Sequence, residues 1–202
     1  MSRWRPLAGA VVLDVGGGPG WFRDAFRSRG AVYLAVESDA GELAGLGAPG
    51  PGSVQASGLA LPIRQAAVDV TFSSNVLEHV PDPERFADEL VRVTRPGGTV
   101  FLGFTPWLSP WGGHETSPYH YLGGHRARRR YQARHGHPPK NAFGRSLYAV
   151  SVSRMLRWAR SADAELVAVL ARYHPWWAQW LTRLPLVREV ATWNVVLVLR
   201  PR

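Results

Sequence analysis

Residues 11–20 read Val-Val-Leu-Asp-Val-Gly-Gly-Gly-Pro-Gly, a short apolar run that passes directly into a glycine-rich turn. The alternating Gly16, Gly18 and Gly20 allow positive φ angles and leave no Cβ between the main chain and a ligand. A strand that ends in such a turn is typical of the first strand of an open α/β sheet, which binds ligands outside the carboxyl ends of its strands. The segment therefore predicts a ligand site at the end of the first strand.

The spacing of these glycines argues against a nicotinamide dinucleotide. That fingerprint requires the pattern G-x-G-x-x-G, and counts that start at Gly16 or Gly18 place the third glycine on Trp21 or Arg23. An acid, Asp14, instead precedes the turn. A nicotinamide oxidoreductase is therefore the weakest of the functional alternatives.

A second acid follows the turn at a distance that suits a ribose. The segment Tyr-Leu-Ala-Val-Glu at residues 33–37 predicts a second buried strand that ends in a carboxylate. About twenty residues beyond the glycine turn, a carboxylate in such a fold accepts hydrogen bonds from the ribose hydroxyls. It would repel a 2′-phosphate. The alternative is that Glu37 is a solvated strand end.

Further motifs follow one another in the order of a known family. The chain has Ser-Gly-Leu-Ala-Leu-Pro at residues 57–62, Val-Asp-Val-Thr-Phe-Ser-Ser-Asn-Val-Leu-Glu-His-Val at 68–80 and Leu-Val-Arg-Val-Thr-Arg-Pro-Gly-Gly at 90–98. Together with the turn and Glu37, they resemble the class I S-adenosylmethionine-dependent methyltransferases of the type 11 group over nearly all of residues 10–105. Motifs within residues 112–141 resemble uncharacterised actinobacterial members, chiefly mycobacterial ones.

The resemblance implies that the chain binds S-adenosylmethionine as its cofactor. It places the ribose on Glu37, the adenine beside the segment that begins at Ser57, and the methionine end on the loop after the fourth strand. Ser57 stands where the family has Asp, so this contact lacks a charge and should be weaker. The residues assigned to the cofactor are Asp14, Gly16, Gly17, Gly18, Gly20, Glu37, Ser38, Ser57, Gly58, Leu59, Ser74, Asn75 and Val76.

The pattern of strands and helices predicts one α/β domain over residues 1–202 with a Rossmann-like, doubly wound sheet. The resemblance implies seven strands, mostly parallel, with an antiparallel strand near the C-terminus. Residues 10–104 form the predicted cofactor-binding half, 105–148 a substrate-loop insertion, and 149–202 a helix, strands and a Trp-rich segment. Strands are predicted at residues 10–15, 32–37, 53–55, 69–73, 99–104, 165–170 and 194–199, and helices at 21–29, 40–46, 83–92 and 154–162.

About nine residues precede the first predicted strand, whereas the family usually has one or two helices there. We therefore expect either a shortened start or another element that closes the site.

The charge and composition of the chain narrow the range of partners it is expected to bind. The formal net charge is +9, and Lys140 is the only lysine. Residues 126–137 hold a dense basic stretch, which indicates either an anionic partner or a solvated helix face. A nucleic acid is not expected, because no recognition helix or stacking platform accompanies the charge. Without cysteines, a secretory signal or an apolar run of membrane-spanning length, the chain is predicted to be a cytoplasmic bacterial enzyme.

Three residues are candidates for the chemistry. Methyl transfer to a hydroxyl needs a proton acceptor. His79 lies in the loop near the methionine end of the cofactor by resemblance, and the alternative is that it packs the short helix there. His114 and Glu115 follow the fifth strand and predict a general base with a carboxylate partner, or else an exposed polar turn. The spacing of the histidines in residues 114–137 matches no zinc motif, so no metal is predicted.

The Trp-rich segment at residues 173–193 suggests the nature of the acceptor. Clustered tryptophans beside arginines suit a membrane interface or an apolar groove, and the competing interpretation is that they cover the sheet. The resulting hypothesis is methylation of a small-molecule or lipid-linked acceptor, with oxygen as the target atom and with peripheral membrane contact. The alternatives are a quinone-type C-methyltransferase and a non-catalytic S-adenosylmethionine-binding domain.

Overall fold

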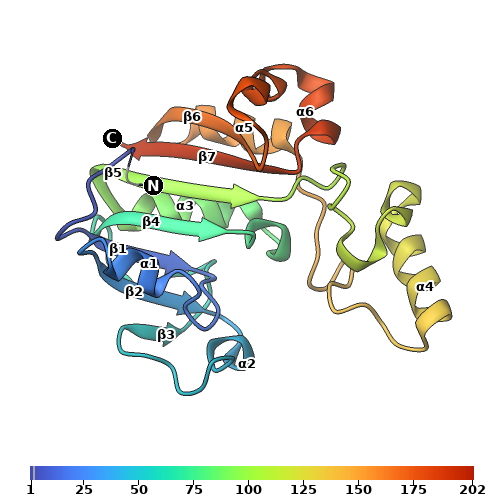
Figure 1. Cartoon of the computed structure of the whole chain (residues 1–202), viewed down its shortest axis with the longest axis horizontal. Helices are drawn as coiled ribbons and strands as arrows, with labels where there is room; N and C mark the ends of the chain where they lie inside the picture. Colours follow the sequence, from blue (N-terminus) through green and yellow to red (C-terminus); the bar gives the residue numbers. More distant parts are fainter. Residues whose placement is uncertain (2) are drawn as a thin grey trace.

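The structure is a computed structural model that describes residue 1 and residues 3–202. A single seven-stranded sheet has the order β3-β2-β1-β4-β5-β7-β6 (Figure 1). Strand β7 pairs antiparallel with both β5 and β6, and the pairs among β1 to β5 are parallel. The strands are β1 (Val11–Val15), β2 (Val32–Glu37), β3 (Ser53–Gln55), β4 (Val68–Ser74), β5 (Thr94–Phe104), β6 (Ala164–Arg172) and β7 (Asn194–Pro201). The predicted fold class and the antiparallel insertion of the last strand are confirmed.

The helices lie on both faces of this sheet or beyond its end. The α-helices are α1 (Arg23–Arg27), α2 (Ala40–Leu43), α3 (Pro83–Val93), α4 (Gly124–His135), α5 (Val152–Ser161) and α6 (Pro185–Ala191), and the 3₁₀ helices are η1 (Leu77–His79), η2 (His114–Thr116), η3 (Tyr119–Leu122) and η4 (Trp176–Arg183). Helix α3 begins as predicted, because the Asp82 carboxylate accepts from the Arg85 N–H at 3.1 Å and Pro83 fills the first turn. Helix α1 is shorter than the predicted 21–29.

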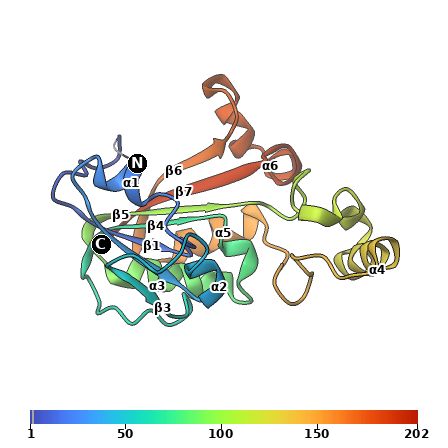
Figure 2. The same ribbon diagram turned by 60° about the horizontal axis from the view of Figure 1, so that its bottom comes forward.

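Two apolar clusters, one on each face of the sheet, pack the sheet against the helices that cover it. On one face, α3 and α5 contribute side chains such as Phe86, Leu90 and Met155 to the larger cluster. On the other face, Phe26 of α1 packs with Phe72 of β4 and other aromatic residues. Figure 2 shows α3 and α1 on opposite sides of the sheet. These layers fix the carboxyl ends of the parallel strands, where a ligand site is expected.

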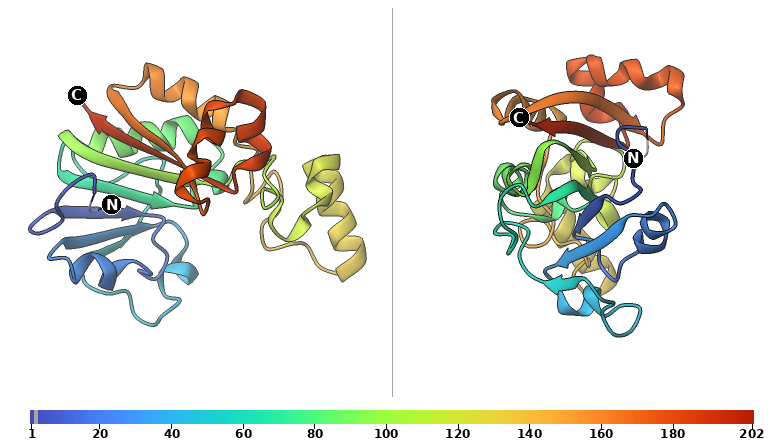
Figure 3. Two further views of the ribbon diagram at one scale, coloured as in Figure 1. Left: turned by 45° about the horizontal axis from the view of Figure 1, so that its top comes forward. Right: turned by 90° about the vertical axis from the view of Figure 1, so that its left-hand side faces the viewer.

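Residues 105–150 form an arm that leaves the end of β5 and carries α4 away from the sheet (Figure 3). The arm contains a helix where the sequence predicted a loop. Helix α4 begins at a glycine and has little apolar periodicity, so its sequence gives no amphipathic signal. It carries most of the basic stretch, with Arg126, Arg129, Arg130 and Arg134 exposed and Arg128 half-buried. No helix in the described part of the chain has the length and apolar character that a bilayer span requires.

Candidate functional site

The glycine turn joins the ends of three strands. The Gly16 N–H donates to the Val36 carbonyl of β2 at 2.8 Å. Gly16 has a φ of +76°, and a Cβ at this position would lie 2.3 Å from Cγ2 of Val76, in the loop after β4. Only glycine fits, because the backbone is left-handed and the space is filled. The turn, the end of β2 and the loop after β4 therefore form one contiguous surface.

Asp14 lies buried beneath this turn. Its carboxylate accepts a hydrogen bond of 2.6 Å from the Tyr33 hydroxyl. A Cβ on Gly17 would approach the same carboxylate at 2.8 Å, so the turn rests directly on the acid. Burial raises the pKa of Asp14 to about 7, against the lowering effect of the Tyr33 hydrogen bond. A cationic ligand above the turn would therefore interact with a carboxylate whose charge is poorly solvated.

Glu37, at the end of β2, lies beside the glycine turn. One of its oxygens accepts from the Gly18 N–H at 3.1 Å, and the other accepts from the N–H groups of Ser38 at 2.7 Å and Asp39 at 3.0 Å. Within the described part of the chain, the oxygen that faces Gly18 accepts only this one bond and has a lone pair left for a further donor. The structure thus brings the predicted ribose-binding acid onto the glycine turn, and the residues present fit a ligand with a ribose diol.

The segment after β3 lies next to the end of β2. The Ala56 N–H donates to the Glu37 carbonyl at 2.9 Å, and the Leu59 N–H donates to the Ser57 hydroxyl at 3.2 Å. Gly58 is held close to helix α3, since a Cβ there would meet the Phe86 ring at 2.5 Å. Ser57 itself is exposed. The predicted adenine segment therefore adjoins the ribose acid.

The loop after β4 has partners that the sequence did not reveal. Arg172 of β6 donates to the Ser74 hydroxyl at 2.6 Å. The amide of Asn194, at the start of β7, donates to the Asn75 side-chain oxygen at 2.7 Å. Asn75 has a φ of +60°. Because both partners lie on the C-terminal strands, only the strand order could have indicated that they meet this loop.

Three further side chains meet beside this loop: Glu78, His79 and His114. One potential ligand atom from each lies within 4.8 Å of the others. The two imidazole rings are 5.0 Å apart between centroids and nearly perpendicular. Burial and the neighbouring His79 lower the pKa of His114, which favours its neutral form. The sequence predicted both histidines but missed Glu78, whose signal is its place immediately before His79.

Glu115 is not the hydrogen-bonded partner of His114. Its carboxylate accepts from the Asn141 amide at 2.8 Å and is exposed on the arm. The His114 backbone is left-handed, with a φ of +49°. His120 is also separate, because it is buried with its Nε2 at 3.1 Å from the Ser109 carbonyl. The predicted His114–Glu115 pair is thus replaced by the cluster with Glu78 and His79.

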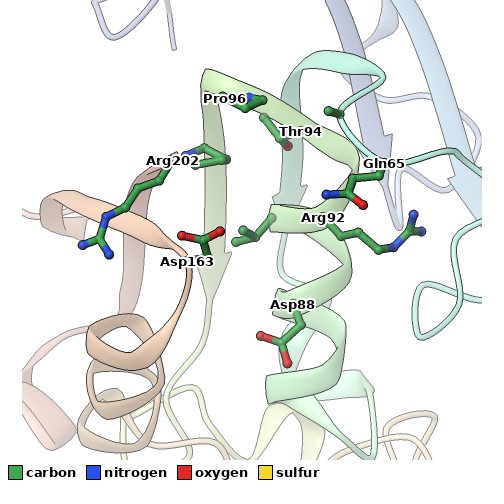
Figure 4. A pocket seen from close by; sticks show the side chains of 10 residues that line it. Gln65, Asp88, Arg92, Thr94, Pro96, Asp163 and Arg202 are labelled. Atoms are coloured by element: carbon green, nitrogen blue, oxygen red, sulfur yellow. The ribbon is translucent and has the colours of Figure 1, made fainter.

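A pocket between α3, the start of β5 and the C-terminus lies elsewhere (Figure 4). Asp88 and Arg92 of α3 line it together with Asp163 and Arg202. These residues lie at the amino ends of β5 and β6, whereas an open α/β sheet binds its ligands at the carboxyl ends. The pocket is therefore not the candidate site.

Comparison with known proteins agrees with this geometry. The model of the methyltransferase domain family matches residues 13–102, from β1 to β5. An uncharacterised methyltransferase of Mycobacterium marinum is 52% identical over 205 residues, which cover 100% of this chain and 80% of that protein. One of Mycobacteroides abscessus is 52% identical over 203 residues, with coverages of 97% and 78%.

Solved structures agree on the fold. A crystal structure of an S-adenosylmethionine-dependent methyltransferase from Mesorhizobium loti aligns with a TM-score of 0.68 at 18% identity, covering 97% of this chain and 93% of that one. Another from Aquifex aeolicus aligns with a TM-score of 0.55 at 14% identity, with coverages of 98% and 85%. At these identities the similarity concerns the fold.

Proposed function

Because this chain belongs to the S-adenosylmethionine-dependent methyltransferases, we propose that it methylates an oxygen atom of a small-molecule or lipid-linked acceptor. The observation that carries the choice of oxygen is the cluster of Glu78, His79 and His114. It lies at the carboxyl end of β4, next to the loop whose Val76 packs on the glycine turn. A neutral amine or a carboxylate would have less need of such a base, because neither must lose a proton before it attacks.

The residues of the turn are suited to the cofactor. When bound, S-adenosylmethionine supplies a methyl group on a positively charged sulfonium. Glu37 would accept from the ribose hydroxyls, and the buried Asp14 would add negative charge beneath the turn. Because Gly17 has no Cβ to clash with the Asp14 carboxylate, the turn can rest on this acid and keep it close beneath the ligand. Ser57 and Leu59 would border the adenine.

The histidines would activate the acceptor. A hydroxyl must lose its proton as its oxygen attacks, and a positioned imidazole is the group most often used for this. His79 and His114 offer two imidazoles side by side. Alignment of the acceptor supplies much of the remaining rate. Glu115 would border the acceptor from the arm, with its carboxylate held by Asn141.

The acceptor's lipid character is inferred from the surface formed by η4 and α6. Trp176 is 86% exposed, Leu186 85% and Trp177 63%. Covering the sheet does not account for rings that remain this exposed. Exposed large apolar side chains that gather on one surface mark contact with a membrane or partner. Arginines on α4 would add attraction for anionic lipids, so we propose that the enzyme, which we expect in the cytoplasm, makes peripheral membrane contact.

The test is transfer from S-adenosylmethionine labelled with ¹³C in its methyl group to a total lipid extract of an actinobacterium. The chemical shift of the product methyl separates an O-methyl from a C-methyl group. We expect an O-methyl signal that His114→Asn reduces at least tenfold while S-adenosylhomocysteine affinity is unchanged. A C-methyl product would favour the quinone-type alternative, and cofactor binding without any transfer would favour the non-catalytic one.

A further inference from the structure

The geometry points to a divalent transition-metal site formed by Glu78, His79 and His114. One ligand atom of each lies within 4.8 Å of the others, at the carboxyl end of the central strand β4. Two imidazoles and one carboxylate are a donor set that zinc and non-haem iron sites use, with coordination positions left open. The set is discontinuous in sequence, and a search for ligand spacing within one segment therefore misses it.

The two imidazoles have the hydrogen-bonding pattern of metal ligands. Nδ1 of His79 is 2.6 Å from the Ser146 carbonyl, and Nδ1 of His114 is 3.4 Å from the Gly112 carbonyl. A nitrogen that faces a carbonyl carries the proton, so Nε2 of each ring keeps its lone pair. Metal-bound histidines characteristically fix their tautomer by such a bond to a carbonyl or carboxylate.

The Glu78 carboxylate has one oxygen without a hydrogen-bond partner among the described residues. Glu78 is only 1% exposed, and its Oε1 accepts from the Thr105 N–H at 3.1 Å. Its Oε2 is buried and has no hydrogen-bond partner among the described residues. Burial of a carboxylate oxygen without a partner is unfavourable, and coordination of a cation would relieve it.

The donors select the class of cation. Imidazole nitrogen suits Zn²⁺, Fe²⁺ and Co²⁺, whereas Mg²⁺ and Ca²⁺ prefer oxygen ligands alone. Ligands about 2.1 Å from a tetrahedral cation are about 3.4 Å apart, so ligand atoms that now lie within 4.8 Å of one another would move together by at most about 1.4 Å on binding. Three protein ligands would leave a position for an oxygen of the acceptor.

A cation here would deepen the proposed function, on which this consequence rests. An acceptor hydroxyl that binds the cation has a lowered pKa, so its proton leaves to solvent before the oxygen attacks. The imidazoles would then act as ligands instead of taking the proton themselves. The binding of the cation by itself requires neither cofactor nor acceptor.

The test is a titration of the metal-free protein with Co²⁺, followed by its visible d–d absorption. We expect one Co²⁺ per chain, and at least a 100-fold loss of affinity in Glu78→Gln and in His114→Asn. Gln keeps an acceptor for Thr105, and Asn tolerates the positive φ at residue 114. The control His137→Asn removes an exposed imidazole on the arm and should bind Co²⁺ as the unchanged chain does.

Thermal unfolding of each variant checks that the fold is intact, and a separate titration with S-adenosylhomocysteine checks the cofactor site. Absence of a Co²⁺ spectrum in the unchanged chain would overturn the metal site. So would folded Glu78→Gln and His114→Asn variants that bind Co²⁺ as tightly as the unchanged chain does. Neither result would bear on methyl transfer, which the ¹³C experiment measures independently.

Discussion

The buried Asp14 carboxylate should make the ligand-free protein less stable at alkaline pH. Its pKa is about 7 in the folded chain, against 3.8 for an exposed carboxyl. The folded state therefore holds the proton more tightly than the unfolded state, and stability falls as pH rises from about 4 to about 7. Since one pKa unit corresponds to about 1.4 kcal/mol, the loss reaches roughly 4 kcal/mol at pH 8 and roughly 1.5 kcal/mol at pH 5.

The perturbation that tests this is Asp14→Asn, which is neutral at every pH and keeps an oxygen for the Tyr33 hydroxyl. The variant should exceed the unchanged chain in unfolding free energy by up to about 4 kcal/mol at pH 8, and by less than half as much at pH 5. The assay is urea unfolding followed by circular dichroism at both pH values. Taking the difference between the two proteins cancels the titration of all other groups.

The same substitution should weaken cofactor binding, because the charge beneath the turn is lost. We expect a reduction of about 1–3 kcal/mol in the binding of S-adenosylmethionine, on the scale of a charged hydrogen bond. Stability and binding then move in opposite directions, which a simple packing defect would not do. A stability difference that is equal at pH 5 and pH 8 would refute the argument.

Three other perturbations test the site and its surroundings. Glu37→Ala should weaken S-adenosylhomocysteine binding by about 1.5–3 kcal/mol in calorimetry, and unchanged affinity would remove Glu37 from the site. Gly16→Ala should lower the unfolding free energy by about 3 kcal/mol or more, because the left-handed backbone is strained by a side chain and the new Cβ overlaps Val76. The control Gly47→Ala, with open space around it, should lower the unfolding free energy only by the cost of the backbone strain, about 1–2 kcal/mol. Trp176→Ser should reduce co-sedimentation with vesicles that contain anionic phospholipid, whereas Leu46→Ser, also at an exposed apolar position, should not. Equal effects would argue against a specific membrane surface.

Local signals in the sequence predicted much of the fold. Helix α3 was predicted because Asp82 and Pro83 mark its start within a few residues. The glycine turn and Glu37 were predicted because a strand, a turn and a second strand place them together by chain connectivity alone. The antiparallel position of β7 followed from the resemblance to the family, since no local pattern specifies which strands a last strand joins.

Contacts between segments that lie far apart in the sequence could not be predicted from the sequence. Arg172 and Asn194 reach the loop after β4 only because β6 and β7 lie at that edge of the sheet. The meeting of Glu78 with His114 depends on how the arm folds back after β5. Neither spacing nor hydropathy contains that information. The arm's own helix was missed because arginines occupy most of its turns.

The most direct test of the account is a calorimetric titration of the purified chain with S-adenosylmethionine and S-adenosylhomocysteine, with NADH as the control. We predict that both sulfur compounds bind at one site per chain, that Glu37→Ala weakens both, and that NADH does not bind. Absence of binding by either sulfur compound, or affinity that Glu37→Ala leaves unchanged, would contradict a cofactor site at the glycine turn.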